Sequence, residues 1–310
     1  MPTKNSKSPE TTINPETETQ SNPVDEVRSD PRLQQFSSAE FSGKLTTLPI
    51  CQILNEKSPN SVGLFIKEKN LALIDWRGGE ANYEHTFSSG TVEKGVLFKS
   101  PRLHILAKSD RYVQLRETGE IICSYETLEG RTKYEEINAD PKKPATLRSF
   151  YVIYLVDENN VSLHTVPLVL SLHGVAAARF GEAYSQFKVK MEIAYAKAMA
   201  SGYRSLNDKF HCLAVFNPTF KPSLEPPNGD KKSWVAIPEL VASPDEQHPI
   251  GEFLALDKQT ELWALAGEAA AFSNKLLKAG NEEAVQNMVS VAPQTVEATA
   301  TAVDEDEIPY

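Results

Sequence analysis

The sequence predicts an α+β protein with a mainly antiparallel, barrel-like β core, one long amphipathic helix, a second helix near the C-terminus and disordered ends. Three observations predict this class. Short β-type runs follow one another from about Val62, the apolar period lengthens after Gly174, and both ends are poor in bulky apolar side chains. With 310 residues, 40% of them hydrophobic, the chain has enough apolar material for a single folded domain over residues 31–280.

The β core is predicted from short apolar runs separated by turn residues. Six such runs precede residue 126, namely 62–66, 71–76, 95–98, 103–107, 111–116 and 121–125. Two longer strands, 147–156 and 161–170, flank a hairpin turn. Further strands are expected at 210–216 and 233–237, with a proline-rich loop over 217–230 between them. Many short strands in succession are typical of a compact barrel or sandwich.

Two segments have the apolar period of helices. Residues 174–200 are rich in Ala, Met, Glu and Lys, and Phe180, Tyr184, Phe187 and Met191 recur at intervals of three and four residues. The second helix is expected at 256–278, where Gly280 provides a C-cap. Both apolar stripes are interpreted as core surfaces.

The net charge of −10 belongs to the ends of the chain. Residues 1–30 carry six acids and three bases, and residues 281–310 carry seven acids and no base, so residues 31–280 are neutral, with 29 of each. Both ends are therefore expected to be disordered, the last thirty residues as a flexible acidic tail. The first twenty residues are polar and no apolar run reaches membrane-spanning length, which predicts a cytoplasmic protein.

Catalytic and metal-binding patterns are poor. The sequence lacks a P-loop, GxGxxG, HExxH and GxSxG, so we expect a non-enzymatic protein without a cofactor. Cys51, Cys123 and Cys212 form no CxxC pair and are interpreted as reduced thiols. His164 and His173 are nine residues apart and His211 adjoins Cys212, but a zinc site built from them lacks a fourth ligand.

Cations interleaved with aromatic residues suggest a nucleic-acid surface within the neutral body. Single-strand binders need cations along the phosphates and aromatic faces for the bases. Residues 94–116 hold six cations against Asp110, with Phe98 and His104 between them, on strands expected to pair. Ordinary surface decoration is the alternative. The candidate residues are Lys94, Lys99, Arg102, Lys108, Arg111, Tyr112 and Arg116 in this run, Arg131, Lys133 and Tyr134 near a later loop, and Trp76 and Arg77 at a strand end.

The last seven residues form a distinct motif. Asp304, Glu305, Asp306 and Glu307 are followed by Ile308, Pro309 and Tyr310. Proline lowers the entropy lost on docking, the apolar residues suit a small pocket, and the acids suit a basic rim. The motif resembles the C-terminal tip of bacterial single-stranded DNA-binding proteins, where an acidic run ends in Ile-Pro-Phe. The resemblance covers residues 304–310 alone, and Tyr310 replaces phenylalanine.

This resemblance implies a sequence-independent single-stranded DNA-binding protein whose tip recruits replication, recombination and repair proteins, with an OB-type barrel as one candidate core. We also expect a homo-oligomer without membrane contacts. The acidic tail is expected to occupy the cationic groove until nucleic acid displaces it. Two alternatives stay open, an adaptor that carries the tip without binding nucleic acid, and a strand-annealing recombination protein. An acidic solubilising tail whose ending is accidental is the alternative explanation of the motif.

Overall fold

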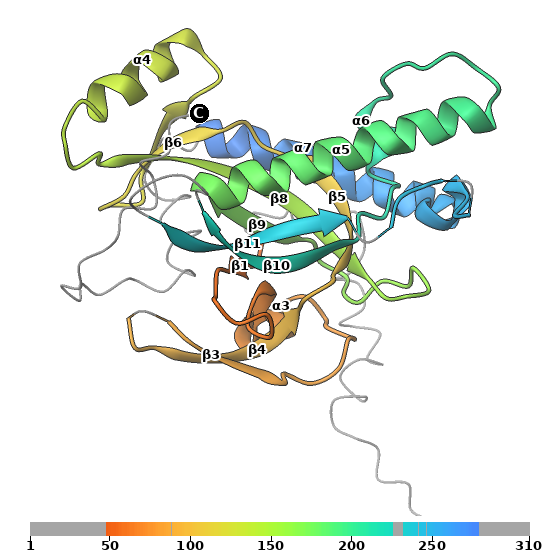
Figure 1. Ribbon diagram of the computed structural model, residues 1–310, viewed down its shortest axis with the longest axis horizontal. Helices are drawn as coiled ribbons and strands as arrows, with labels where there is room; N and C mark the ends of the chain where they lie inside the picture. The colour runs from red at the N-terminus through yellow and green to blue at the C-terminus, as the bar shows by residue number, and fades with distance from the viewer. Residues whose placement is uncertain (1–47, 88, 226–231, 241, 246, 279–310) are drawn as a thin grey trace, which may run out of the picture. The chain divides into compact units, whose positions relative to one another are not determined.

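The computed structural model describes residues 48–87, 89–225, 232–240, 242–245 and 247–278. The expectations for the two ends of the chain, the tip at 304–310 included, lie outside these residues. A nine-stranded sheet dominates the described part, together with a two-stranded ribbon and the helices that cover them (Figure 1). The α+β class and the mainly antiparallel sheet are confirmed.

The sheet follows a path that its sequence order does not reveal. Its strands run in the order β3 (Tyr83–Thr86), β4 (Val92–Phe98), β2 (Gly63–Lys67), β1 (Ile50–Leu54), β9 (Leu168–His173), β8 (Ala145–Val156), β6 (Tyr112–Leu115) and β7 (Ile121–Ser124). β5 (Arg102–Lys108) pairs with the second half of β8, on the edge that β6 shares farther along. Among these strands, β1 and β9 pair in parallel and every other ladder is antiparallel.

The barrel closure is not confirmed. Among the described residues, the ends of the path, β3 and β7, are not paired with each other. The OB-type barrel therefore stays without support from the strand pairing.

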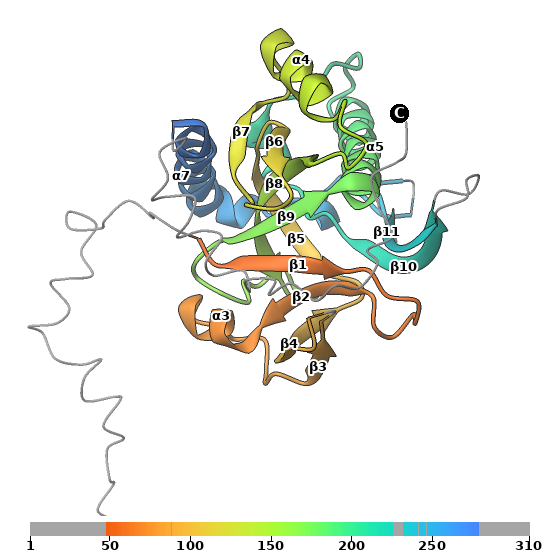
Figure 2. The ribbon, with the colours of Figure 1, turned by 90° about the vertical axis from the view of Figure 1, so that its left-hand side faces the viewer.

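Alternation along the central strands creates two cores, one on each face of the sheet. Tyr151, Ile153 and Leu155 of β8 belong to one core, and Val152 and Tyr154 belong to the other. Helix α5 (Gly174–Ala198) supplies Phe180, Tyr184, Phe187 and Met191 to the first core, and helix α7 (Gln259–Lys278) supplies Leu262 and Ala269 to the second. The two helices consequently lie on either side of the β8 region (Figure 2).

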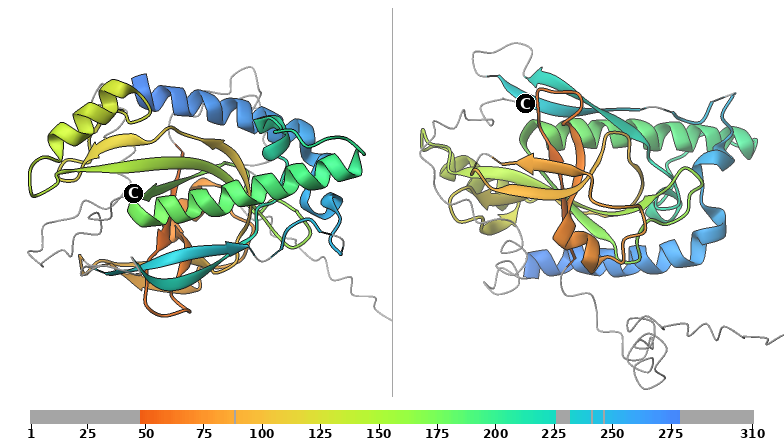
Figure 3. Two further views of the ribbon diagram at one scale, coloured as in Figure 1. Left: turned by 45° about the horizontal axis from the view of Figure 1, so that its top comes forward. Right: turned by 90° about the horizontal axis from the view of Figure 1, so that it is seen from below.

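Smaller elements complete the described fold. β10 (Pro218–Glu225) and β11 (Ser233–Leu240) form an antiparallel ribbon beside α5 (Figure 3). Helix α4 (Leu128–Ile137) follows β7 and begins at Thr127, whose hydroxyl accepts a hydrogen bond from the Gly130 amide at 3.0 Å. The remaining helical turns are α3 (Glu68–Leu73), α6 (Asp208–His211), η3 (Ile250–Phe253) and η4 (Leu256–Lys258).

Several predicted elements need correction. Residues 71–76, read as a strand, mostly form α3 and the turn after it, because only one side of the short segment is buried. The expected strand at 210–216 begins in α6 and continues as isolated bridges. The proline-rich segment 217–230 was expected to be a loop, yet 218–225 form β10, where Pro218 and Pro222 are tolerated in a two-stranded ribbon.

Candidate nucleic-acid interface

A groove of about 680 Å³ runs along β5 between the two main helices. One wall is the part of α5 that contains Ser185, Lys188 and the buried Tyr184, and the facing wall is the Trp263 side of α7. Residues Ile105–Arg111 form its floor, because β5 pairs with β8 and leaves α5 and α7 to flank it from opposite faces of the sheet. Helix α6 lines the groove as well, through Asp208, Lys209 and His211.

The floor changes direction at a bulge. The pairing of β5 with β8 shifts register between Ile105 and Ala107, and the strand ends at Lys108. Ser109 then links the end of β5 to β8 by two hydrogen bonds. Its amide donates to the Phe150 carbonyl at 2.8 Å, and its hydroxyl oxygen accepts from the Phe150 amide at 2.9 Å. The bulge and these two hydrogen bonds place Lys108 and Arg111 at the groove.

Four cations from different elements line the groove: Lys108, Arg111, Lys188 and Lys209. Burial, and then the neighbouring charges of Lys188 and Arg111, lower the pKa of Lys108. The ammonium of Lys188 lies 5.5 Å from the ring centre of Tyr184, and that of Lys209 lies 5.1 Å from the ring centre of Trp263. The groove therefore combines positive charge with aromatic surface.

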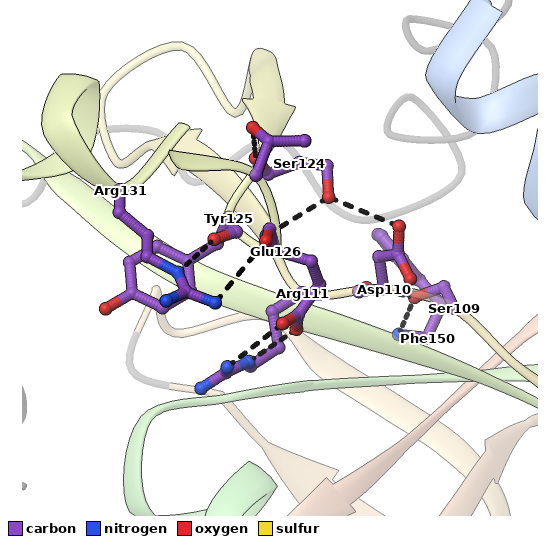
Figure 4. Close-up of polar contacts among 9 residues, drawn as sticks. Ser109, Asp110, Arg111, Ser124, Tyr125, Glu126, Arg131 and Phe150 are labelled. Carbon is purple, nitrogen blue, oxygen red and sulfur yellow. Dashed lines mark hydrogen bonds and ion pairs between the residues drawn. The ribbon is translucent and has the colours of Figure 1, made fainter. Parts of the chain in front are cut away.

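Three carboxylates share the groove with these cations. Glu126 receives two hydrogen bonds from Arg111, from Nε at 2.8 Å and from Nη2 at 3.3 Å, and these bonds lower the pKa of Glu126 (Figure 4). Asp110 accepts the Ser124 hydroxyl at 3.2 Å, and Asp208 is at the start of α6. The formal charges of the residues that line the groove therefore nearly cancel. The positions of the individual charges matter more than the net charge.

Guanidinium groups and tyrosine rings cluster next to Glu126, beside the residues that line the groove. The guanidinium carbons of Arg111 and Arg131 lie 4.9 and 5.9 Å from the ring centre of Tyr125. Arg131 also donates to the backbone carbonyls of Tyr125 and Glu126, as Figure 4 shows. Tyr134 meets Tyr125 edge to face at 5.4 Å. These contacts hold Arg111 in one orientation at the mouth of the groove.

The wall formed by α7 is smooth. Ala266, Gly267 and Ala270 follow Trp263 along the groove, and a Cβ added at Gly267 would meet nothing within 4 Å. The Trp263 indole donates to the Lys209 carbonyl at 2.8 Å, which fixes the ring plane against α6. Small residues next to a held aromatic ring leave space for a flat ligand.

The structure divides the candidate residues between different surfaces. Lys108 and Arg111 line the groove, and Arg131 and Tyr134 adjoin it through Tyr125. Lys94 is exposed on β4, Lys99 donates to Asn60 at 3.3 Å, and Arg102 donates to the turn at 157–160. Arg116 donates to the Lys143 carbonyl at 2.9 Å, Lys133 is exposed on α4, and Arg77 pairs with Asp75 at 2.9 Å.

Two aromatic expectations and one pairing expectation are wrong. Tyr112 is fully buried, so its ring offers no face to a base. His104 is buried too. Trp76 is partly buried and packs edge to face on Phe98, and its role stays a prediction. The strands at 92–98 and 102–108 do not pair with each other, because β4 pairs with β2 and β3 whereas β5 pairs with β8. The basic run therefore does not form one face.

Several residues that line or adjoin the groove were not predicted from the sequence. Lys188 and Trp263 each follow a buried residue of an amphipathic helix, Phe187 and Leu262, so they lie at the border of the apolar stripe. A cation or a tryptophan at such a border is a usable signal for a helix that lines a groove. The sequence around Tyr125 and Lys209 shows no comparable apolar stripe that would have indicated a groove.

Other functional features are absent from the described residues. No group of three or more His, Cys, Asp or Glu side chains there could hold a metal ion. No helix in the same residues is both long and apolar enough to cross a bilayer.

Comparisons with known proteins give a family without an assigned activity. Uncharacterized protein 254L of Invertebrate iridescent virus 6 is 25% identical over 145 residues, which cover 46% of this chain and 42% of that protein. The match therefore spans less than half of the viral protein's length. No solved structure matches the chain. The family model described as a domain of unknown function, DUF5895, matches residues 46–284, and the chain belongs to this family.

Proposed function

We propose that this protein binds single-stranded DNA without sequence preference, in the groove between α5 and α7, as a non-enzymatic protein that needs no cofactor. One observation carries the proposal. Four cations, from β5, the loop after it, α5 and α6, converge on a single groove that also contains the partly exposed Trp263 ring, against which Lys209 lies. Phosphate-tracking cations beside stacking rings are what a sequence-tolerant single-strand site requires.

The shape of the groove favours single strands over duplexes. Trp263 lies on a wall that flanks the β5 floor and is partly exposed, so a base must enter the groove to reach its ring. The bases of a duplex are stacked and paired inside the double helix, whereas an unpaired base can be turned toward a protein ring. The smooth surface at Gly267 gives such a base room beside Trp263.

The carboxylates in the groove are compatible with this function. Glu126 orients the Arg111 guanidinium through two hydrogen bonds. The carboxylates of the groove would repel a phosphate that lay next to them and not next to a cation. The strand path is thereby defined by paired charges and not by a uniform positive field.

The biological role follows the sequence motif. The protein would shield single strands in the cytoplasm during replication, recombination or repair, as a homo-oligomer, and residues 304–310 would recruit partner proteins. The acidic tail would compete with nucleic acid for the groove. Deleting residues 304–310 should then tighten single-strand binding at low salt, and an unchanged affinity would contradict the competition.

The test is a fluorescence-anisotropy titration with a labelled dT oligonucleotide at several salt concentrations, beside a duplex of the same length. We expect tight single-strand binding whose log affinity falls with log salt, by about 0.7 for each phosphate contact, and much weaker duplex binding. Absence of single-strand binding at low salt, with the tail removed as well, would overturn the proposal.

The adaptor is the second candidate, because Asp110, Glu126 and Asp208 leave the groove with little net charge. A groove of mixed charge also suits a polypeptide. An adaptor would bind no oligonucleotide yet would still bind partners through residues 304–310. Strand annealing would instead appear as faster pairing of complementary strands.

A further inference from the structure

A buried carboxylate organises the α6 side of the groove. Glu192 of α5 has a side chain that is 5% exposed, and it accepts four hydrogen bonds. Its Oε2 accepts the Tyr203 hydroxyl at 2.8 Å, while Oε1 accepts the Ser205 hydroxyl, the Leu206 amide and Nε2 of His211 at 3.1, 3.0 and 3.0 Å. Burial alone would raise the pKa of Glu192, but these hydrogen bonds outweigh burial and lower it. The group is therefore a carboxylate at neutral pH.

This carboxylate sets the tautomer of His211. A carboxylate can only accept hydrogen bonds, so Nε2 of His211 must carry a hydrogen and donate it to Glu192. In the neutral ring Nδ1 is then a bare acceptor. Within the part of the chain that the structure describes, Nδ1 is buried and has no hydrogen-bond partner.

His211 belongs to the groove even though it is 4% exposed. Burial lowers its pKa first, Glu192 opposes this, and Lys188 lowers the pKa further. A buried polar atom without a partner is costly, and a proton alone would leave a buried N–H without an acceptor, so Nδ1 is satisfied only by protonation together with an anion that accepts its hydrogen bond. The charged and titratable groups around it come from α5, α6 and β5, and they are Lys188, Glu192, Asp208, Lys209, His104 and Lys108.

We propose that His211, together with Lys188 and Lys209, forms a phosphodiester subsite in which binding of the anion is coupled to uptake of one proton by the His211 ring. The proton adds at Nδ1, which turns this atom from an acceptor into a donor, while Nε2 keeps its hydrogen bond to Glu192. The proton comes from solvent and no covalent bond to the ligand forms. The subsite deepens the proposed function, since it places one phosphate of the strand near α6.

Thermodynamic linkage fixes the sign of the pH effect. An anion stabilises the protonated ring, so binding raises the pKa of His211 from its lowered value in the free protein. Affinity must then increase as the pH falls through the interval between the free and bound pKa values. His104 and His164 do not contribute in this range, because burial lowers the pKa of each to about 4.

Two probes separate this inference from the proposed function. A dT oligonucleotide offers phosphodiesters and bases, and an abasic spacer oligomer of equal length offers phosphodiesters alone. Neither titrates between pH 6 and 8. Calorimetry in buffers of different ionisation enthalpy measures the protons taken up when each probe binds to the full chain.

We expect uptake of up to about one proton per chain near pH 6.5, and binding of the abasic oligomer about threefold to tenfold tighter at pH 6 than at pH 8, since one pKa unit corresponds to a factor of ten. His211→Gln retains an amide donor for Glu192 without a titratable ring, and it should abolish this uptake. His248→Gln, at an exposed histidine next to Asp245, is the matched control and should retain it.

Equal proton uptake by the wild type and His211→Gln would overturn the subsite, and so would pH-independent binding in the wild type. Because His211→Gln could unfold, the His211 ring resonances of the wild type should also be titrated with and without the abasic oligomer. An unchanged His211 pKa contradicts the inference. Proton-coupled binding of the abasic oligomer without tighter binding of dT would support the subsite while contradicting base stacking, and binding of neither probe would overturn both proposals.

Discussion

The two halves of the basic run 94–116 lie on different surfaces of the fold. Lys94 lies on β4, Lys99 lies in the turn after it, and Arg102 begins β5. Arg102 donates to the Asp157 carbonyl at 3.1 Å and to Asn160 at 2.6 Å. Lys108 and Arg111 come at the end of β5 and line the groove. Strand pairing separates the halves, because β4 and β5 join different neighbours. Closeness in sequence therefore says little about which cations share a surface.

The largest expected effect is a charge reversal confined to the groove. Lys188→Glu with Lys209→Glu should weaken binding of dT by about a hundredfold and flatten its salt dependence by about one to two phosphate contacts. The matched control, Lys94→Glu with Lys99→Glu, changes the net charge equally and should leave the affinity within about threefold, which reflects long-range charge alone. Equal losses in the two double variants, measured by anisotropy, would show that net charge and not the groove governs binding.

The second effect tests the aromatic wall. Trp263→Leu should cost about 1–3 kcal/mol of binding free energy, because one base loses its stacking surface. Trp234→Leu, on the ribbon strand β11, removes a tryptophan from outside the groove and should leave dT affinity unchanged. Binding of an abasic oligomer should differ little between the variants, and a comparable loss for that probe would argue against stacking.

The third effect contrasts a structural cation with a binding cation. Lys67 is 6% exposed, lies 3.0 Å from Glu93 and covers the Phe87 ring at 4.8 Å. Lys67→Met should lower the free energy of unfolding by about 1–2 kcal/mol, since Glu93 loses its partner while remaining partly hydrated. Lys188→Met should do the reverse, with weaker dT binding and nearly unchanged stability in urea titrations. Binding loss in Lys67→Met at full stability would remove this distinction.

The smallest effect concerns Gly267. Because a Cβ there meets nothing within 4 Å, Gly267→Ala should stabilise α7 by about 0.5–1 kcal/mol in thermal unfolding without weakening dT binding. Gly267→Leu should keep most of the stability gain but place a bulky side chain in the groove and reduce affinity. Unimpaired dT binding by Gly267→Leu would show that the DNA strand does not lie against α7.

The two long helices and most of the central strands were predictable from periodicity, since α5 and α7 contribute apolar stripes to the two cores. The sequence missed β1 and β3, and it missed α4, whose residues include Arg131, Lys133 and Tyr134. The site was only partly predictable for a physical reason. Lys108 and Arg111 stood in a visible basic run, whereas Lys188, Lys209 and Trp263 join them only after α5 and α7 pack on opposite faces of the sheet.

The central claim is that the strand lies in this groove, and photo-crosslinking tests it most directly. A dT oligonucleotide is irradiated with the full chain at low salt, and the crosslinked residues are located by mass spectrometry. We expect adducts at Trp263 or Tyr125 that disappear in Lys188→Glu with Lys209→Glu. Adducts confined to residues 83–99, on β3 and β4, would contradict it.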